Sequence, residues 1–328
     1  MNSTSSTGPT SSTGSTGPLR IAVVGAGGIG GYFGGRLALA GHDVAFVARG
    51  AHLEALRRDG LAVKSVAGDF TVPSARATDD TAEIGEVDYV LLCVKTWQLA
   101  AVIDALPPLL GTGTAVVTLQ NGVEAPAEVA RAIGRDAVLP GTAKIIAHLD
   151  GPGRVRHLGG PGLLAFAEWD NRPTGRVARL QAALDAADGV TAVVSEDIWA
   201  ELWAKFLFVV PPGGLGAVTD VPFGLLRTRP GTRQLLVAAM TEIRQVAQAM
   251  DVELPDDVVP TSMAFLDQQP AAGTTSLHRD LVAGLPSELE ALTGAVVRIG
   301  ERTGTATPVN SVLYEVLRLR EEASRSTS

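Results

Sequence analysis

The sequence has a single cysteine and no clustered metal ligands. Cys93 lies in the apolar run YVLLCVK, so no disulfide can form within one chain, and this absence fits a reducing cytoplasm. The histidine, cysteine and acidic residues show no metal-ligand spacing. The sequence therefore predicts a cytoplasmic protein without a structural disulfide or a metal site.

Positive charge and long apolar runs are also scarce. Lys and Arg number 27 against 35 Asp and Glu, which gives a formal net charge of −8 and argues against a nucleic-acid-binding surface. No apolar run is expected to reach the length of a bilayer, because the longest candidates are interrupted by Lys205 and by Pro211-Pro212. We therefore expect neither a nucleic acid nor a membrane as partner.

The first 18 residues, MNSTSSTGPTSSTGSTGP, lack every large apolar side chain except that of the initial methionine. Such a stretch cannot bury enough surface to offset its chain entropy, so residues 1–18 are expected to be a disordered tail. They lack the basic start and apolar core of a secretory signal. The remaining length is enough for two domains.

Apolar strands alternate with helical segments in the first half of the chain. Strands are expected at 21–24, 43–49, 87–95, 114–122 and 136–145, and helices at 28–40, 98–106 and 124–133. This alternation predicts a doubly wound, mainly parallel sheet, with antiparallel strands in the glycine-rich stretch 145–170. Later helices are expected at 196–210, 230–250, 256–268, 275–283, 286–302 and 308–323. The fold class is therefore an α/β Rossmann domain over 19–194 followed by an all-α domain over 195–323.

A glycine turn follows the first apolar strand. The residues expected to contact a dinucleotide there are Gly25, Ala26, Gly27, Gly28, Ile29 and Gly30. In the G-x-G-x-x-G spacing the first glycine allows a tight turn, the second lets a pyrophosphate approach, and the third lets helix and strand pack closely. Free N–H groups at the helix start then bind the anion. A purely structural glycine turn is the alternative.

The end of the second strand indicates which dinucleotide would bind. NAD-binding folds place an acidic residue there for the ribose 2′-hydroxyl, but this chain has Arg49, in FVARGAH. A guanidinium suits a 2′-phosphate through forked, charge-assisted hydrogen bonds. The expected cofactor is therefore NADP(H), and an exposed arginine beside Asp43 or another acid is the alternative.

Polar side chains also follow two later strands. Lys95 in VKTWQ and Asn121 in LQNGV come where ligands of doubly wound sheets bind, beyond the carboxyl ends of the strands. Lys95 can hold a phosphate or a substrate carboxylate, and Asn121 can bond the nicotinamide ribose or the substrate. Asn-Gly by itself is more typical of a turn.

One lysine interrupts the most apolar helical segment. Lys205 lies in AELWAKFLFVVPPGG, residues 200–214. Glu201 precedes it by four residues, the favourable orientation for a helical ion pair, so the spacing alone predicts a routine salt bridge. The other interpretation is a proton donor whose pKa is lowered towards neutral by burial.

Together these motifs resemble the ketopantoate reductase (2-dehydropantoate 2-reductase) family. The matching stretches are GAGGIGG, ARG, VKTWQ, LQNG, ELWAK, TSLHRD and SELEALTG, in the family's order over about residues 20–323. The resemblance implies a Rossmann domain, an all-helical second domain, and NADPH-dependent reduction of a 2-oxo acid to a 2-hydroxy acid. The most direct expectation is reduction of 2-dehydropantoate to pantoate in pantothenate biosynthesis.

The resemblance also assigns roles to single residues. It makes Lys205 the general acid. The other residues that it places against cofactor or substrate are Lys95, Asn121, Ala147, Ser276 and Glu288. It implies that Ala147 touches the nicotinamide, Ser276 the substrate, and Glu288 the ribose or the substrate. His278 is either a further acid-binding group or an exposed helix residue.

Two positions depart from the family pattern. Members of known specificity usually place asparagines one and two turns after the lysine, where this chain has Val209 and Gly213. Neither side chain can bond a substrate hydroxyl, and recognition of a hydroxyl depends on such partners. The alternatives are therefore a paralogous enzyme for a more apolar 2-oxo or 2-hydroxy acid, and a non-catalytic NADP(H)-binding protein. The predicted partner is a small 2-oxo acid, and a homodimer is left open.

Overall fold

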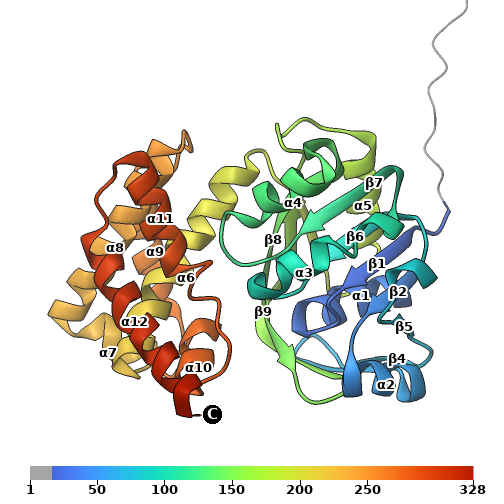
Figure 1. Ribbon diagram of the computed structural model, residues 1–328, viewed down its shortest axis with the longest axis horizontal. Coiled ribbons are helices and arrows are strands. Elements are labelled where there is room, and N and C mark those ends of the chain that lie inside the picture. The colour runs from blue at the N-terminus through green and yellow to red at the C-terminus, as the bar shows by residue number, and fades with distance from the viewer. Residues whose placement is uncertain (1–16, 328) are drawn as a thin grey trace, which may run out of the picture.

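The computed structural model describes residues 17–327, so the predicted tail falls almost wholly outside the described residues. Within them the chain forms two lobes side by side (Figure 1). One lobe is a sheet flanked by helices, and the other contains only helices. Both lobes match the predicted fold class.

Ten strands form one sheet, in the order β4-β3-β9-β8-β7-β6-β1-β2-β5 with β10 beside β9. The strands are β1 (Arg20–Val24), β2 (Asp43–Val47), β3 (Leu61–Ser65), β4 (Phe70–Val72), β5 (Arg76–Thr78), β6 (Val87–Leu92), β7 (Leu110–Thr118), β8 (Val138–Leu149), β9 (Arg154–Phe166) and β10 (Thr191–Val194). The central neighbours β2, β1, β6, β7 and the start of β8 are parallel. The rest of β8 pairs antiparallel with β9, as the glycine-rich stretch predicted.

Helices cover both faces of this sheet. They are α1 (Gly28–Leu39), α2 (Gly50–Asp59), α3 (Leu99–Ile103), α4 (Ala125–Ile133) and α5 (Gly175–Asp185). Ile21 and Val23 of β1 pack into a core with α1, α2 and α5, whereas Ala22 and Val24 pack on the other face with α3 and α4. The continuous apolar run of β1 therefore reflects burial on both faces. The sequence did not predict α2, α5, β3 to β5 or β10.

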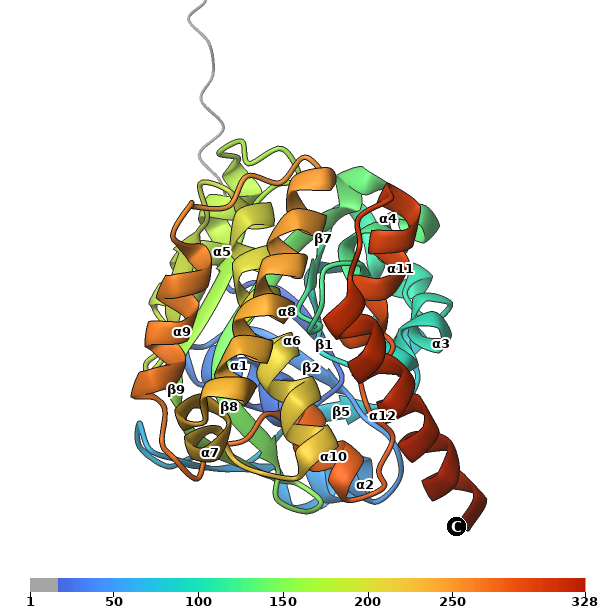
Figure 2. The same ribbon diagram turned by 90° about the vertical axis from the view of Figure 1, so that its left-hand side faces the viewer.

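The second lobe is built around one long helix. Its helices are α6 (Ile198–Thr219), α7 (Phe223–Thr228), α8 (Pro230–Ala249), α9 (Val258–Gln268), α10 (Ser276–Val282), α11 (Thr293–Thr303) and α12 (Pro308–Thr327). The helices α8, α9, α10 and α12 are arranged around α6 (Figure 2). The predicted all-helical domain is confirmed, and α7 was not expected.

The expectation that α6 ends at residue 210 is wrong, because the helix continues through Pro211 and Pro212 to Thr219. Prolines remove two backbone donors and normally kink or end a helix. Here residues 210–217 are all buried among the surrounding helices, and this packing offsets the loss. The uninterrupted helix also has the length and apolarity of a membrane span, contrary to expectation. However, 67% of that stretch is buried within the lobe, as in a core helix.

The expectation of a helix over 286–302 is also wrong at its start, since α11 begins at Thr293. The preceding segment turns instead, with the Leu292 N–H donating to the Glu288 carbonyl and the Gly294 N–H to Leu289. Leu292 has φ −106° and ψ −94°, outside the helical region. The turn directs the Glu288 side chain towards the sheet lobe.

Candidate active site

The glycine turn has the geometry of a dinucleotide cradle. Gly25 has φ +98°, and a Cβ there would lie 2.8 Å from the Val94 nitrogen. A Cβ on Gly30 would lie 2.1 Å from the Gly25 carbonyl oxygen, so only a glycine at this position lets the helix pack so closely on the turn and strand. A Cβ on Gly27 would meet nothing within 4 Å, and no side chain caps α1. The turn therefore leaves open space and free N–H groups for an anion.

His52 supports this turn, and sequence reasoning missed it. Its Nδ1 accepts a hydrogen bond from the Gly153 N–H at 2.9 Å, so Nε2 carries the proton and donates to the Ala26 carbonyl at 2.8 Å. The start of α1 also touches β8, since a Cβ on Gly28 would lie 2.5 Å from the Ala147 carbonyl oxygen. The structure thus brings Ala147 beside the glycine turn.

Arg49 is exposed at the carboxyl end of β2, where it precedes α2. Within residues 17–327 its guanidinium has neither a hydrogen bond nor an ion pair. The acid considered as its partner, Asp43, pairs instead with Arg20 and Arg76. Arg49 is therefore available to a ligand at this edge of the sheet.

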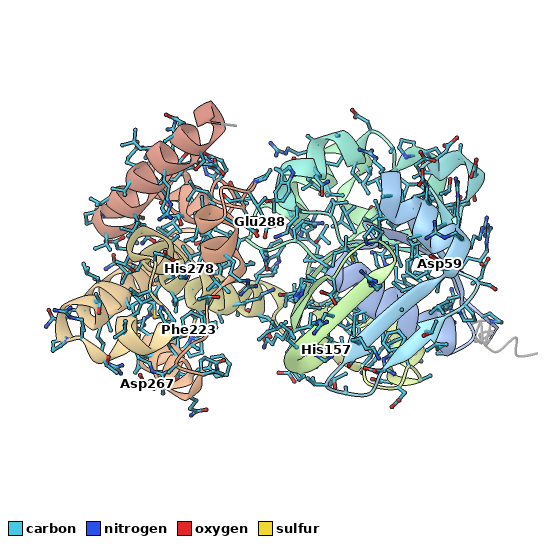
Figure 3. All side chains as sticks on the ribbon, turned by 90° about the horizontal axis from the view of Figure 1, so that it is seen from below. Asp59, His157, Phe223, Asp267, His278 and Glu288 are labelled. Carbon is cyan, nitrogen blue, oxygen red and sulfur yellow. The ribbon has the colours of Figure 1, made fainter. Side chains whose placement is uncertain are left out.

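Glu288 gathers the polar groups at the ends of β6 and β7. Its carboxylate accepts hydrogen bonds from Asn121 Nδ2 at 2.9 Å, Lys95 Nζ at 3.4 Å and the Thr96 N–H at 3.3 Å. Lys95 also pairs with Asp280 of α10 at 3.3 Å. Glu288 is only 3% exposed and lies on the edge of the helical lobe that faces the sheet (Figure 3). The structure thus joins three residues that the sequence predicted separately.

Lys205 extends from α6 to the sheet. Its Nζ donates a hydrogen bond of 2.9 Å to the Ala143 carbonyl of β8. Burial lowers the pKa of the Lys205 ammonium to about 8; the carboxylate of Glu288 opposes this decrease, and Lys144 adds to it. A proton donor with a pKa near neutrality suits acid catalysis at physiological pH. We use "domain junction" for the region of Lys95, Asn121, Lys144, Lys205 and Glu288.

The routine helical salt bridge that the spacing predicted for Lys205 is absent from the described residues. Glu201 forms its ion pair with Lys144 of β8 instead. Lys144 follows Ala143 directly, so the two contacts lie side by side between β8 and α6. Neither Lys144 nor Asp280 was predicted, because a strand lysine and a helix aspartate carry no motif of their own.

The predicted residues of α10 differ in their surroundings. Ser276 is partly exposed at the first position of the helix, one turn before Asp280 and hence on the same face. His278 is buried at 5% exposure and makes a hydrogen bond of 3.2 Å to Asp220. His278 therefore packs on the end of α6, and the expectation that it is an exposed helix residue was wrong.

The departures from the family pattern have a structural explanation at one position. A Cβ on Gly213 would lie 3.0 Å from Thr275 Oγ1 and 3.4 Å from Leu277. The start of α10 thus covers Gly213 closely, and a larger side chain would have to displace it. Val209 remains partly exposed, one turn after Lys205 on the same helix face.

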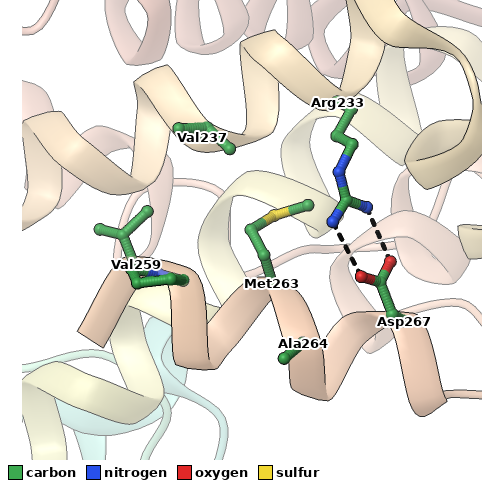
Figure 4. Close-up of a pocket in the computed structure, with 7 residues that line it drawn as sticks. Arg233, Val237, Val259, Met263, Ala264 and Asp267 are labelled. Carbon is green, nitrogen blue, oxygen red and sulfur yellow. Dashed lines mark hydrogen bonds and ion pairs between the residues drawn. The ribbon is translucent and has the colours of Figure 1, made fainter. Parts of the chain in front are cut away.

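A surface pocket of about 320 Å³ lies elsewhere, between α8 and α9 (Figure 4). It is lined by Arg233, Val237, Val259, Pro260, Met263, Ala264 and Asp267. Two hydrogen bonds of 2.7 and 2.8 Å join Arg233 to Asp267, so its charged groups neutralise each other. No predicted site residue lines this pocket. Four of the predicted residues, Lys95, Asn121, Lys205 and Glu288, instead gather at the domain junction, which is therefore the candidate site.

Two family models match the chain. The model described as ketopantoate reductase PanE/ApbA matches residues 21–171, and its C-terminal counterpart matches residues 197–321. A 2-dehydropantoate 2-reductase of Mesorhizobium japonicum is 32% identical over 326 residues, covering 93% of this chain and 98% of its own. The crystal structure of a PanE/ApbA family ketopantoate reductase from Ralstonia eutropha has 34% identity and a TM-score of 0.86, covering 94% of this chain and 100% of that one.

A more distant likeness concerns the fold alone. The ternary structure of D-mandelate dehydrogenase with NADH and anilino(oxo)acetate shares 22% identity and a TM-score of 0.83, covering 94% of this chain and 99% of that one. The matches to the two family models span both lobes, and the predicted family is confirmed. The chain therefore belongs to the PanE/ApbA family of ketopantoate reductases and is an oxidoreductase.

Proposed function

We propose that this protein reduces a 2-oxo acid to the 2-hydroxy acid with NADPH, most directly 2-dehydropantoate to pantoate, and that Lys205 is the general acid. One observation carries the proposal: the Lys205 ammonium has a lowered pKa and reaches the carboxyl edge of the sheet that bears the glycine turn. The names of the close relatives support the same reaction class.

The cofactor would be held by the glycine turn and Arg49. The open space at Gly27 and the uncapped start of α1 suit a pyrophosphate, and the unpaired guanidinium of Arg49 suits a 2′-phosphate. Asn121 and Glu288 would contact the nicotinamide ribose, with Ala147 beside the ring. We also propose residues 19–194 as the nucleotide-binding domain and 195–323 as the catalytic domain.

Lys205 and Lys95 of the domain junction, together with Ser276 and Ala143, then have separate tasks. A bound nicotinamide supplies the hydride. Lys205 stabilises the negative charge that grows on the carbonyl oxygen and delivers a proton from Nζ. Lys95 and Ser276 bind the substrate carboxylate, and the Ala143 carbonyl holds the Lys205 ammonium in place between turnovers.

A second substrate class is favoured by Val209 and Gly213. Gly213 is covered by α10 and Val209 presents an apolar surface one turn beyond Lys205. Neither can bond the hydroxyl of 2-dehydropantoate, so a more apolar 2-oxo acid would fit this face better.

The test is an NADPH-oxidation assay over a panel of 2-oxo acids, from 2-dehydropantoate to apolar and aromatic ones. We expect turnover by the wild type and its loss in Lys205→Ala. Equal, low rates with 2-dehydropantoate and unrelated keto acids would contradict the specific assignment. NADPH binding without reduction of any keto acid would contradict the proposed reaction.

Arg49 provides the test of cofactor choice. Replacing it by alanine removes a charge-assisted contact to the 2′-phosphate, so the Kd for NADPH should rise roughly tenfold to a hundredfold while that for NADH stays nearly constant. Fluorescence titration measures both constants. Arg58→Ala, in the last turn of the helix α2 that follows Arg49, is the matched control because Arg58 pairs with its neighbour Asp59. Equal losses for both nucleotides in Arg49→Ala would refute the 2′-phosphate role.

A further inference from the structure

The pairing of Glu201 in the folded protein differs from what its position in α6 favours. Glu201 and Lys205 have the i, i+4 spacing and the orientation that stabilise a helical ion pair. Nevertheless Glu201 pairs with Lys144, and the Lys205 ammonium donates to the Ala143 carbonyl. Some feature of the fold must therefore keep the Glu201 carboxylate from forming an ion pair with the Lys205 ammonium, although its charge still acts on Lys205.

Lys144 is the residue that pairs with Glu201. It lies on β8 directly after Ala143, and its ammonium forms an ion pair with the Glu201 carboxylate of α6. The chain has only four lysines, at positions 64, 95, 144 and 205, among 27 basic residues. Three of the four belong to the domain junction. At position 144 a lysine, unlike an arginine, presents a compact, single-point cation to Glu201.

We propose that Lys144 is a positioning residue that acts through Lys205: it captures Glu201 and so keeps the Lys205 ammonium free to face the substrate. Without Lys144, the Glu201 carboxylate would turn along α6 and form the i, i+4 pair with Lys205. The general acid would then be drawn away from Ala143 and tied to a carboxylate. This inference rests on the proposed role of Lys205 as general acid.

The charges around Lys205 make the consequence measurable. Glu201 faces it from α6, Lys144 from β8, and Glu288 from the turn before α11. Glu288 also forms an ion pair with Lys95, and Lys95 forms a second ion pair with Asp280. Loss of Lys144 removes a cation that lowers the pKa of Lys205 and releases an anion that raises it. Both changes have the same sign, so Lys205 becomes a weaker acid.

The test compares three variants with the wild type. Lys144→Met should raise the pKa of Lys205 by roughly half a unit and lower kcat for 2-oxo acid reduction roughly twofold to threefold at pH 7. Glu201→Gln should instead lower the pKa of Lys205. The double variant Lys144→Met/Glu201→Gln should return both the pKa and kcat close to wild type, because the competing carboxylate is gone.

The pKa can be read without any turnover. Labelling with 13C,15N-lysine gives four 13Cε signals, which Lys→Arg variants assign, and their shifts against pH report each ammonium in the full-length protein. Lys64→Met is the matched control, since Lys64 forms an exposed ion pair with Asp69 outside the domain junction. It should leave the Lys205 titration and kcat unchanged.

Two outcomes would overturn the proposal. An unchanged Lys205 titration in Lys144→Met would show that Lys144 does not hold Glu201 away. A kcat that the added Glu201→Gln change fails to rescue would show that Lys144 only clamps β8 onto α6. Failure of the proposed function is distinguishable, because the wild type would then reduce no 2-oxo acid while the 13Cε shifts still followed the predicted order.

Discussion

Replacing Lys205 by alanine is expected to lower kcat for 2-oxo acid reduction roughly 10²- to 10⁴-fold, the range usual for loss of a general acid. The variant loses both the group that stabilises negative charge on the carbonyl oxygen and the proton that it delivers. NADPH should still bind, since the glycine turn and Arg49 lie on the other lobe. Steady-state kinetics and a separate NADPH titration measure the two effects.

The pH dependence of the wild type belongs to the same prediction. Reduction needs Lys205 protonated, and burial lowers its pKa to about 8. We therefore expect kcat to be level below pH 7 and to fall towards a tenfold loss per unit above about pH 8. In the direction of oxidation, which needs the neutral amine, the same group should make kcat rise through this range. A profile that is flat from pH 6 to 10 in both directions would exclude Lys205 as the acid.

Among the single substitutions proposed for this protein, Glu242→Ala is expected to give the largest loss of folding stability. Glu242 of α8 is 7% exposed and accepts hydrogen bonds from the Val309 N–H at 2.8 Å, the Asn310 N–H at 3.0 Å and Asn310 Nδ2 at 2.7 Å. It thus satisfies the start of α12 with a carboxylate, which the helix dipole favours. Its loss leaves buried donors unpaired and should cost roughly 2–4 kcal/mol of unfolding free energy.

Urea unfolding followed by far-UV circular dichroism measures this loss as a lower transition midpoint. Glu301→Ala, an exposed glutamate on α11, is the control and should change stability by less than about 0.5 kcal/mol. Glu242→Gln should lie between the two, because one amide oxygen can still accept a bond. An unfolding curve of Glu242→Ala that overlays the control would mean that α12 needs no cap from α8.

Local sequence pattern predicted the fold well where the pattern was long and regular. The helices expected at 230–250 and 308–323 correspond to α8 and α12 within a few residues, and the strands around the glycine turn were placed correctly. The failures share a cause. Residues 210–217 of α6 stay helical because the surrounding helices bury them. The sequence of this segment alone does not predict which elements will pack against it.

The site was predictable as a set of candidates and not as an arrangement. Lys95, Asn121 and Glu288 were named from separate motifs, and the structure joins them around one carboxylate. His278 was considered for the site and lies outside it, because the helix face on which it packs depends on Asp220 and α6. Their catalytic and binding roles stay predictions until the variants are measured.

The sequence by itself determined the features that depend on a few neighbouring residues: the glycine turn before α1, Arg49 after β2, and a lone lysine in α6. Only the tertiary structure decided which charges meet. Lys95 and Glu288 are 193 residues apart in the chain yet share a bond, and Glu201 pairs with Lys144 of another element rather than with its helical neighbour. The reason is physical, since ion pairs form between the groups that packing brings together, and packing depends on the whole chain.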